Sequence, residues 1–393
     1  MISIKEAIQL VKSNSDTLGI AKVGLNEAFG YLVANDIKSP INMPPFRQSA
    51  MDGYAINITD KLSYKFIGEI KAGDGYQPIL NTGEAVRIFT GAPVPDTANA
   101  VVMQEKIKIK DGNIILEHEI PQGHNIRSLG EQVKKGDLAL KKDTKLTPAG
   151  IGFLASLGIT EVDVYKKPRI AVITTGNELI EPNQPLDHGK IYESNSHMLT
   201  AALANLGHNN VSVYKVEDNY DNTYQLLDKT INNSDLVLIT GGISVGDYDY
   251  VGKALNELQV EEIFYKVVQK PGKPLYFGKK AETLIFALPG NPAAALTCFY
   301  IYVYIALQKI TNNQQNELPR IQAESLSNFE KKGDRPQFLK AIYLDGKAEL
   351  LEGQNSSMLQ TFALSNALVF VPAEQNQIAI GDPVETILLP IEL

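Results

Sequence analysis

The sequence predicts a multidomain protein of the α/β plus β class, built around a central, doubly wound, mostly parallel α/β domain. In residues 168–317, apolar runs of strand length alternate with amphipathic helical segments, which is typical of a parallel sheet covered by helices. In residues 46–136 and 318–393, short apolar runs are separated by turn-forming residues, which indicates β-rich structure. We therefore expect an inserted β-rich module, a small helical domain and a C-terminal β-barrel-like domain around the central one.

Two helix signals flank the β-rich module. Ser3 and Glu6 form a capping-box pair ahead of an apolar stripe at helical spacing. In the later segment, Thr147 suits the N-cap, Pro148 the first turn and Gly158 the C-terminal cap. We expect both helices in one small domain that carries the module as an insertion. The predicted domains are residues 1–45 with 137–167, 46–136, 168–317 and 318–393.

The central domain alternates strands and helices regularly. Strands are expected at residues 169–174, 211–216, 236–240, 263–268, 274–278 and 283–287. Helices are expected at residues 198–206, 224–231, 251–258 and 292–310. The strands at 274–278 and 283–287 look like a hairpin, and the others suit a parallel sheet. Ligands of such sheets bind beyond the carboxyl ends of the strands.

Composition limits the functional classes. A net charge of −8 argues against a nucleic-acid-binding surface and implies that an anionic substrate would need a local basic pocket. The single cysteine, Cys298, excludes an internal disulfide framework and lies in an apolar run, so we expect it in the core. The apolar stretch at residues 293–307 is shorter than a membrane span, and the first residues lack a signal-peptide pattern. We expect a cytoplasmic protein without membrane contacts.

Four polar loops follow strands of the central domain and are expected at one edge of the sheet. Taken one at a time, each is explained equally well as an ordinary turn. Together they indicate a binding cleft, in which the glycine pair offers free backbone N–H groups to an anion. The loop residues are Thr174, Thr175, Gly176 and Glu178; Glu217, Asp218 and Asn219; Gly241, Gly242, Ser244, Asp247 and Asp249; and Pro289, Gly290 and Asn291.

Three carboxylates in these loops suggest a metal ion. Glu178, Asp218 and Asp249 would repel one another in a shared cleft unless a cation or protons compensated their charge. Mg²⁺ with oxygen ligands, bridging to a substrate phosphate, meets this requirement. The alternative for each carboxylate is a helix cap or a pair with a lysine.

A basic loop follows another strand of the same sheet. It carries Lys266, Lys270 and Lys273, and Pro271 and Pro274 restrict its backbone. Loop lysines are usually solvated, which is the alternative here. Their position after a strand nevertheless favours the cleft that contains the glycine pair.

A series of ordered motifs resembles the MoeA family, the molybdopterin molybdenumtransferases, which includes the E domain of gephyrin. The motifs are PPFRQSAMDGYA, TGAPVPDTANAVVMQE, NIRSLGE, LTPAGIGFLASLG, TTGNEL, TGGISVGDYDY, KPGKPLYFGK and LPGNPAAA. They cover nearly the whole chain. The central motifs alone would also fit the related molybdopterin adenylyltransferase, whereas the flanking motifs favour the molybdenumtransferase.

The resemblance implies a molybdopterin-binding-like central domain and the last step of molybdenum cofactor assembly. In that step adenylylated molybdopterin and molybdate react, with Mg²⁺ assisting, to give the molybdenum cofactor and AMP. The resemblance also implies an elongated homodimer of four-domain subunits. Molybdopterin adenylyltransferase and molybdoenzymes are the protein partners that such an enzyme would be expected to meet.

The resemblance also implies roles for individual residues. The residues matching catalytic positions are Asp52, Glu178, Asp218, Asp249, Lys266 and Lys270, of which Glu178, Asp218 and Asp249 are the metal candidates. Those expected to bind substrate are Thr90, Arg127, Thr175, Gly241, Gly242, Ser244, Lys273, Pro289 and Asn291, with Arg335, Ser356 and Ser357 resembling molybdate contacts. One departure is Gln132, where many relatives have an aspartate.

Three other functions are alternatives to this one. The first is adenylyl transfer from ATP to molybdopterin, and the second is a non-catalytic scaffold like the gephyrin E domain. The polar loops argue against a pure scaffold. A nicotinamide dehydrogenase is a distant third, because G-x-G-x-x-G is missing after every predicted strand.

Overall fold

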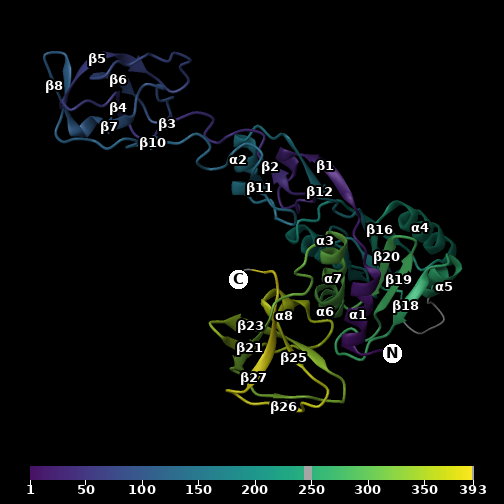
Figure 1. Cartoon of the computed structure of the whole chain (residues 1–393). Helices are drawn as coiled ribbons and strands as arrows, with labels where there is room; N and C mark the ends of the chain where they lie inside the picture. Colours follow the sequence, from purple (N-terminus) through teal and green to yellow (C-terminus); the bar gives the residue numbers. More distant parts are fainter. Residues whose placement is uncertain (243–249, 392–393) are drawn as a thin grey trace. The chain divides into compact units, whose positions relative to one another are not determined.

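The computed structural model describes residues 1–242 and 250–391 of the chain (Figure 1). It divides into two compact units. The first consists of Met1–Ala21, Gly30–Leu32 and Tyr165–Leu393, and the second of Lys22–Phe29 and Val33–Val164. The first unit contains the α/β domain and a β-barrel, and the second contains the β-rich module.

The α/β domain is built on a six-stranded sheet in the order β16-β13-β17-β20-β19-β18. Its strands are β13 (Ile170–Thr175), β16 (Val211–Val216), β17 (Leu236–Thr240), β18 (Glu261–Tyr265), β19 (Tyr276–Lys280) and β20 (Thr283–Leu288). The first four strands in that order pair in parallel, whereas β19 runs antiparallel to both β20 and β18. The predicted parallel sheet and its hairpin are therefore confirmed.

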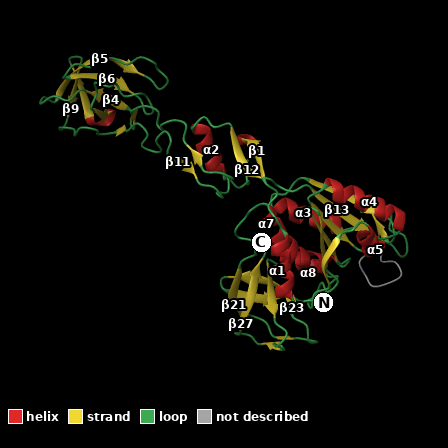
Figure 2. Cartoon of the chain, turned by 45° about the vertical axis from the view of Figure 1, so that its right-hand side comes forward, coloured by secondary structure: helices red, strands yellow, loops and turns green. Residues whose placement is uncertain are grey.

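Helices cover both faces of this sheet because successive strand residues point to opposite sides. Ile170 and Val172 of β13 pack into one hydrophobic cluster, and Ala171 and Ile173 into another. The first cluster includes α1 (Ile4–Asn14), α3 (Asn195–Asn205), α6 (Pro292–Cys298) and α7 (Tyr304–Ile310); the second includes α4 (Tyr220–Asn233) and α5 (Tyr250–Glu257). Figure 2 labels α1, α3, α4, α5 and α7 among these helices.

The first helix corrects one predicted boundary. Ser3 and Glu6 do form the capping box of α1. However, Ala7 and Val11 of α1 are buried in the core of the α/β domain, and residues 1–21 belong to the first unit. The prediction placed residues 1–45 together with residues 137–167. An amphipathic pattern indicates which face of a helix is buried but not against which domain, and this explains the difference.

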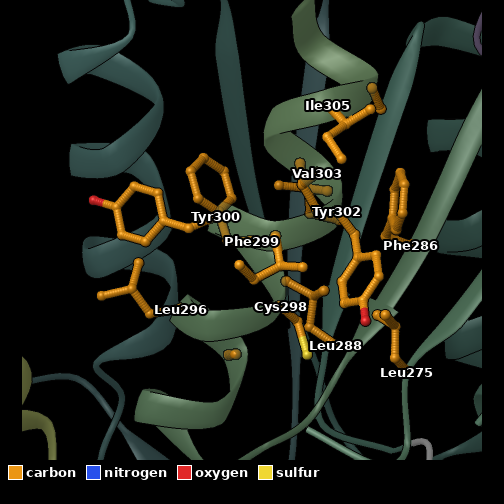
Figure 3. Close-up of a cluster of buried hydrophobic side chains, with 14 of the residues drawn as sticks. Leu275, Phe286, Leu288, Leu296, Cys298, Phe299, Tyr300, Tyr302, Val303 and Ile305 are labelled. Atoms are coloured by element: carbon orange, nitrogen blue, oxygen red, sulfur yellow. The ribbon is translucent and has the colours of Figure 1, made fainter. Parts of the chain in front are cut away.

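The expected helix over residues 292–310 is one continuous helical stretch with a π-helical turn, η3 (Phe299–Val303), between α6 and α7. Figure 3 shows Tyr302 and Cys298 on the side of the helix toward Phe286 and Leu288 of the sheet, whereas the Phe299 ring lies beside Tyr300. Cys298 is buried, as predicted. Within the described residues this is the one helix long and apolar enough to cross a membrane, and 89% of it is buried inside the fold.

The C-terminal region forms a closed barrel, β21-β24-β23-β25-β27, which confirms the predicted barrel-like domain. Its strands are β21 (Arg320–Ser325), β23 (Gln337–Leu344), β24 (Lys347–Leu350), β25 (Ala367–Val371) and β27 (Pro383–Leu388). A short pair, β22 (Phe329–Glu330) with β26 (Gln377–Ile378), and a helix, α8 (Leu359–Ala363), accompany it. Phe338 and Leu368 of the barrel join the hydrophobic cluster around α6, so the barrel is packed on the α/β domain.

The second unit contains the predicted β-rich module as a six-stranded sheet, β7-β4-β6-β5-β9-β8. Its strands are β4 (Gly53–Ile56), β5 (Ser63–Ile70), β6 (Glu84–Ile88), β7 (Ala100–Met103), β8 (Ile107–Lys110) and β9 (Asn113–Leu116). Two buried clusters lie against this sheet, which explains the alternating apolar residues of its strands.

The remainder of this unit is mixed rather than purely helical. Thr147 caps α2 (Pro148–Ser156) as predicted. The other segments are the 3₁₀ turns η1 (Leu25–Glu27) and η2 (Gln104–Lys106) and short strand pairs. These pairs are β1 (Ile20–Gly24) with β12 (Glu161–Tyr165), β2 (Ile37–Lys38) with β11 (Leu138–Leu140) and β3 (Gln48–Ser49) with β10 (Ile126–Arg127).

Replacing Phe286 by Ala should destabilise the first unit by about 3–5 kcal/mol, because a large buried side chain leaves a cavity. Phe286 is fully buried and stacks on Phe277 with ring centroids 4.5 Å apart. Urea unfolding followed by circular dichroism measures the change. Leu344→Ala is the control, since Leu344 is 69% exposed and its loss should cost no more than about 0.5 kcal/mol. Equal midpoints for the two variants would contradict the prediction.

Candidate functional site

A cleft of about 640 Å³ opens in the first unit, where loops from the carboxyl ends of the parallel strands face loops of the barrel. The α/β side contributes Thr175, Glu178, Leu179, Ile191, Asn195, Thr240, Gly241, Gly242, Lys270, Pro271, Gly272, Lys273, Pro274, Pro289, Gly290, Asn291 and Ala294. The barrel side contributes Arg335, Gln354, Asn355 and Ser356. The predicted loop residues that line this one cleft are Thr175, Glu178, Gly241, Gly242, Lys270, Lys273, Pro289, Gly290 and Asn291.

The glycine pair after β17 forms the innermost turn of the cleft. Gly241 and Gly242 have φ angles of +89° and +63°. A Cβ atom on Gly241 would lie 2.5 Å from the carbonyl oxygen of Thr175, and one on Gly242 would lie 2.7 Å from the Thr175 hydroxyl. Both the backbone conformation and the space therefore require glycine. Thr175, which was expected at the same edge of the sheet, therefore lies directly beside the glycine turn.

Asn195 connects two of these loops and was not predicted. Its Nδ2 donates to Thr240 Oγ1 (2.7 Å) and to the carbonyl oxygen of Gly290 (2.8 Å). Its Oδ1 is buried and has no hydrogen-bond partner within the described residues. Asn195 is the first residue of α3, after the pair β14 (Leu179–Ile180) and β15 (Ile191–Tyr192). A polar residue starting a helix is an ordinary pattern, so the sequence offered only a weak signal.

The side chain of Gln269 is fully buried and forms hydrogen bonds with the backbone of the basic loop. The Gln269 Nε2 donates to the carbonyl oxygen of Pro271 (2.9 Å), and the Tyr302 hydroxyl donates to its Oε1. Lys270 and Lys273 line the cleft on this loop, as predicted. Lys266 does not line the cleft; its ammonium lies 4.5 Å from the centre of the Tyr265 ring.

The barrel supplies the opposite wall. Arg335 donates from Nη1 to the carbonyl oxygen of Gln269 (2.9 Å), which ties it to the basic loop. Asn291 Nδ2 donates to Ser356 Oγ (2.9 Å), and the Ser356 carbonyl oxygen accepts from the N–H of Ala294 (3.2 Å). Arg335, Asn291 and Ser356 are therefore brought together as predicted. Ser357 is exposed and does not line the cleft.

The predicted carboxylates have different positions. The Glu178 carboxylate folds over Gly176, where a Cβ atom would lie only 2.6 Å from Oε2. Asp218 does not line the cleft, but its loop pairs with the neighbouring one: Asn177 N–H donates to Asp218 Oδ2 (3.2 Å), and Asp218 N–H donates to Asn177 Oδ1 (3.0 Å). Asp249, with Ser244 and Asp247, lies outside the described residues. Over residues 1–242 and 250–391, no three acidic, histidine or cysteine side chains converge on a metal site.

Three predicted residues lie in the second unit. Thr90 donates to Asp52 Oδ1 from its N–H (2.7 Å) and from its hydroxyl (2.8 Å). These two hydrogen bonds, the backbone one first, lower the pKa of Asp52 below its ordinary value of 3.8. Arg127 donates from Nη1 to Gln48 Oε1 (3.3 Å). Asp52 is exposed, so its ionised carboxylate is accessible.

Taken together, the cleft combines a glycine turn, two ammonium groups and a guanidinium at the carboxyl edge of a parallel sheet. These features are typical of α/β proteins that bind anions beyond the carboxyl ends of their strands. Three family models match the chain in succession: the MoeA N-terminal region (domain I and II) over residues 2–158, the "Probable molybdopterin binding domain" over residues 171–309, and the MoeA C-terminal region (domain IV) over residues 322–389.

Full-length relatives agree with these matches. A molybdopterin molybdenumtransferase of Haemophilus influenzae is 35% identical over 372 residues, which cover 92% of each chain. One of Staphylococcus epidermidis is 32% identical, covering 98% of this chain and 95% of its own. A crystal structure of the molybdopterin biosynthesis MoeA protein of Pyrococcus horikoshii superimposes with a TM-score of 0.83 at 28% identity, covering 100% of both chains. The chain belongs to the MoeA family of molybdopterin molybdenumtransferases.

Replacing Gly241 by Ala should weaken anion binding and destabilise the first unit, because the new Cβ would lie 2.5 Å from the Thr175 carbonyl oxygen. Gly189 is the matched control: its φ of +83° is similar, but nothing lies within 4 Å of its Cβ position. Gly189→Ala should show only the conformational cost of roughly 1 kcal/mol. Thermal unfolding and molybdate titration compare the two variants, and equal effects would refute a steric requirement at Gly241.

Thr90→Ala should raise the pKa of Asp52 toward 3.8, but only in part, because the backbone hydrogen bond of residue 90 remains. Since folding lowers this pKa, the stability due to Asp52 is present at neutral pH and is lost as the pH falls through the folded pKa, below 3.8. NMR titration of the ¹³C-labelled aspartate carboxylates measures the shift. Thr97→Ala is the control, since the Thr97 hydroxyl accepts from Leu80 N–H instead. An unchanged Asp52 titration in Thr90→Ala would contradict this account.

Proposed function

We propose that this cleft is where the chain inserts molybdate into adenylylated molybdopterin and releases AMP. Membership of the family assigns the chain to the transferases of molybdenum cofactor biosynthesis. The observation that carries the proposal for the cleft is its two-walled structure. The glycine turn and the basic loop lie on the α/β side, and Arg335 of the barrel, on the other side, is hydrogen-bonded to the backbone of the basic loop.

The two walls suit two different anions. Gly241 and Gly242 provide a turn whose backbone can approach the pyrophosphate of the adenylylated pterin closely. Molybdate is a tetrahedral dianion, which ammonium, guanidinium and hydroxyl donors stabilise. Lys270, Lys273 and Arg335 are candidates for that role, with Ser356 beside them. Pro289 and Asn291 complete this group as proposed substrate contacts.

Mg²⁺ is proposed as the metal cofactor. Glu178 in the cleft and Asp218 in the adjoining loop offer carboxylate oxygens, the donor type that Mg²⁺ prefers. The residues present therefore fit such an ion, and Asp249 is proposed as a third ligand. When bound, Mg²⁺ would neutralise charge on the pyrophosphate. The protein's own part is to hold the phosphate on the glycine turn and to keep its cations close to the molybdate.

Further parts of the proposal rest on the family resemblance. Asp52, Thr90 and Arg127 in the second unit, and Lys266, Ser244 and Ser357 in the first, are proposed as additional catalytic or substrate-binding residues. A cytoplasmic homodimer is proposed as the working form, with molybdopterin adenylyltransferase and molybdoenzymes as possible partners. The family models that match before and after the central domain favour this reaction over adenylyl transfer and over a pure scaffold.

The test is to incubate the protein with adenylylated molybdopterin, molybdate and Mg²⁺. The proposal expects stoichiometric AMP and molybdenum cofactor. Adenylylated product formed from ATP and molybdopterin without molybdate would instead support an adenylyltransferase. A protein that releases no AMP under any of these conditions but binds a peptide partner would support the scaffold.

Glu178→Gln should lower AMP release by about 10²-fold, because it removes a charge aimed at the proposed metal and phosphate while keeping the side chain's size. Single-turnover release of AMP measures the effect. The matched control is Glu181→Gln, since Glu181 is exposed in the next part of the chain and does not line the cleft. If Glu178→Gln released AMP at the wild-type rate while Mg²⁺ was limiting, Glu178 would have no role in holding the metal.

A further inference from the structure

A buried lysine lies behind the barrel wall of the cleft. Lys340, in the middle of β23, is 4% exposed. Its Nζ donates to three carbonyl oxygens, those of Gly353 (2.8 Å), Met358 (3.1 Å) and Asn355 (3.2 Å). Among the ion pairs of the described residues, none includes Lys340. Burying an unpaired ammonium is costly, so these three hydrogen bonds are its compensation.

All three carbonyls belong to one loop, residues 351–358, which we call the barrel loop. A second contact joins the loop to the backbone of Lys340: the Oε1 of Gln354 accepts from Lys340 N–H, and its Nε2 donates to the Lys340 carbonyl oxygen (both 2.9 Å). The other side of the loop faces the cleft, which Gln354, Asn355 and Ser356 line. Lys340 therefore contacts the barrel loop on the side opposite to the one that lines the cleft.

We propose that Lys340 is a positioning residue for the anion site: its buried ammonium holds the barrel loop in the shape that presents Asn355 and Ser356 to the cleft. This inference rests on the proposed function, because it assigns Lys340 to the site of molybdate binding. The ammonium has three N–H donors for three carbonyls. Without it, the carbonyls of Gly353 and Met358 would lose their charged donor, the Asn355 carbonyl would keep only the N–H of Met358 (3.1 Å), and the loop would rearrange.

The protonation of this lysine gives the proposal a measurable signature. Burial lowers the pKa of Lys340 from 10.5 to about 8. Above that pH the neutral amine has two donors for three carbonyls and no charge, so molybdate affinity should fall. Stability should change in the opposite direction. Between pH 8 and 10.5 the unfolded chain binds more protons than the folded one, so the Lys340 contribution to the free energy of unfolding rises with pH.

Few other charges belong to the elements packed against Lys340. Strand β24 carries Lys347 and Glu349, and the barrel loop carries Glu352. Neighbouring β25 and helix α8 contain no ionisable Asp, Glu, His, Lys or Arg side chain. These charged residues are unchanged in every variant described below. An effect of pH on molybdate affinity that is lost when Lys340 is replaced can therefore be assigned to Lys340.

The chain offers a matched control. Lys331 is also a buried lysine of the barrel domain, 6% exposed, and donates to the carbonyl oxygens of Pro372 (2.9 Å) and Ala373. Neither of these residues lines the cleft. Replacing either lysine by Met removes a buried ammonium from carbonyl oxygens, but only the change at Lys340 should reach the anion site.

The experiment measures molybdate binding by calorimetry at pH 7 and pH 9 for the wild type, Lys340→Met, Lys340→Arg and Lys331→Met. At pH 7, Lys340→Met should bind molybdate about tenfold more weakly than the wild type, as expected when one charge-assisted interaction is lost. Its affinity should show no step near pH 8. Lys340→Arg, which stays charged, should keep wild-type affinity to pH 9, and Lys331→Met should follow the wild-type profile.

Wild-type affinity and pH profile in Lys340→Met would overturn the inference, as would equal losses in Lys331→Met. If Lys340→Met does not fold, the pH dependence of the wild type is the test. A molybdate affinity that falls near pH 8 while the free energy of unfolding rises supports the positioning role of Lys340, and an affinity that does not change with pH refutes it. Hydrogen exchange of the barrel loop is measured in parallel and does not depend on molybdate. A wild type that binds no molybdate would overturn the proposed function, whereas unchanged exchange in Lys340→Met would overturn the positioning role itself.

Discussion

The cleft depends on the hydrogen bonds that join the basic loop to the barrel. Lys270 donates its N–H to the Pro336 carbonyl oxygen and accepts from Phe338 N–H, both at 2.9 Å, and Arg335 donates to the carbonyl oxygen of Gln269 at the same distance. These hydrogen bonds join the backbone of Lys270, on the α/β side of the cleft, to the barrel on the other side. Stabilising an anion requires cations whose positions are set before it binds, since reorganisation costs part of the interaction energy. The joined walls meet that requirement.

Cations held in the cleft also explain how a protein with a net charge of −8 can bind an anionic substrate. Attraction between a charge and an anion in a partly enclosed cleft depends on the few groups within a Debye length, about 8 Å at physiological ionic strength, and little on the charge of the whole chain. Lys270, Lys273 and Arg335 are such groups. Glu178 in the same cleft opposes them, which is consistent with a carboxylate that needs a cation of its own.

Much of the fold could be predicted because strands buried on both faces and turn residues leave local signals. The parallel sheet then required its loops to meet at one edge, and Thr175, Gly241 and Asn291 do so. Residues whose roles depend on distant partners could not be predicted. Gln269 directly follows an apolar strand-like run and Lys340 lies within one, and only the fold shows which carbonyl groups they contact. Lys266 follows a strand as expected, but its φ of +68° and its contact with Tyr265 remove it from the cleft lining.

Asn195, Gln269 and Lys340 share a physical feature that bears on how such a site is built. Each has polar atoms removed from solvent, and each donates to carbonyl oxygens of a loop that lines the cleft. An irregular loop has no helix or strand ladder to pair its backbone groups, so its shape depends on other hydrogen bonds to its backbone. Buried donors supply them at a cost in desolvation that an apolar residue would avoid. Three such donors lie behind loops that line the cleft, whereas Lys331 donates to carbonyl oxygens outside it. A buried donor therefore points to a ligand site only where the loop in front of it also lines a cleft.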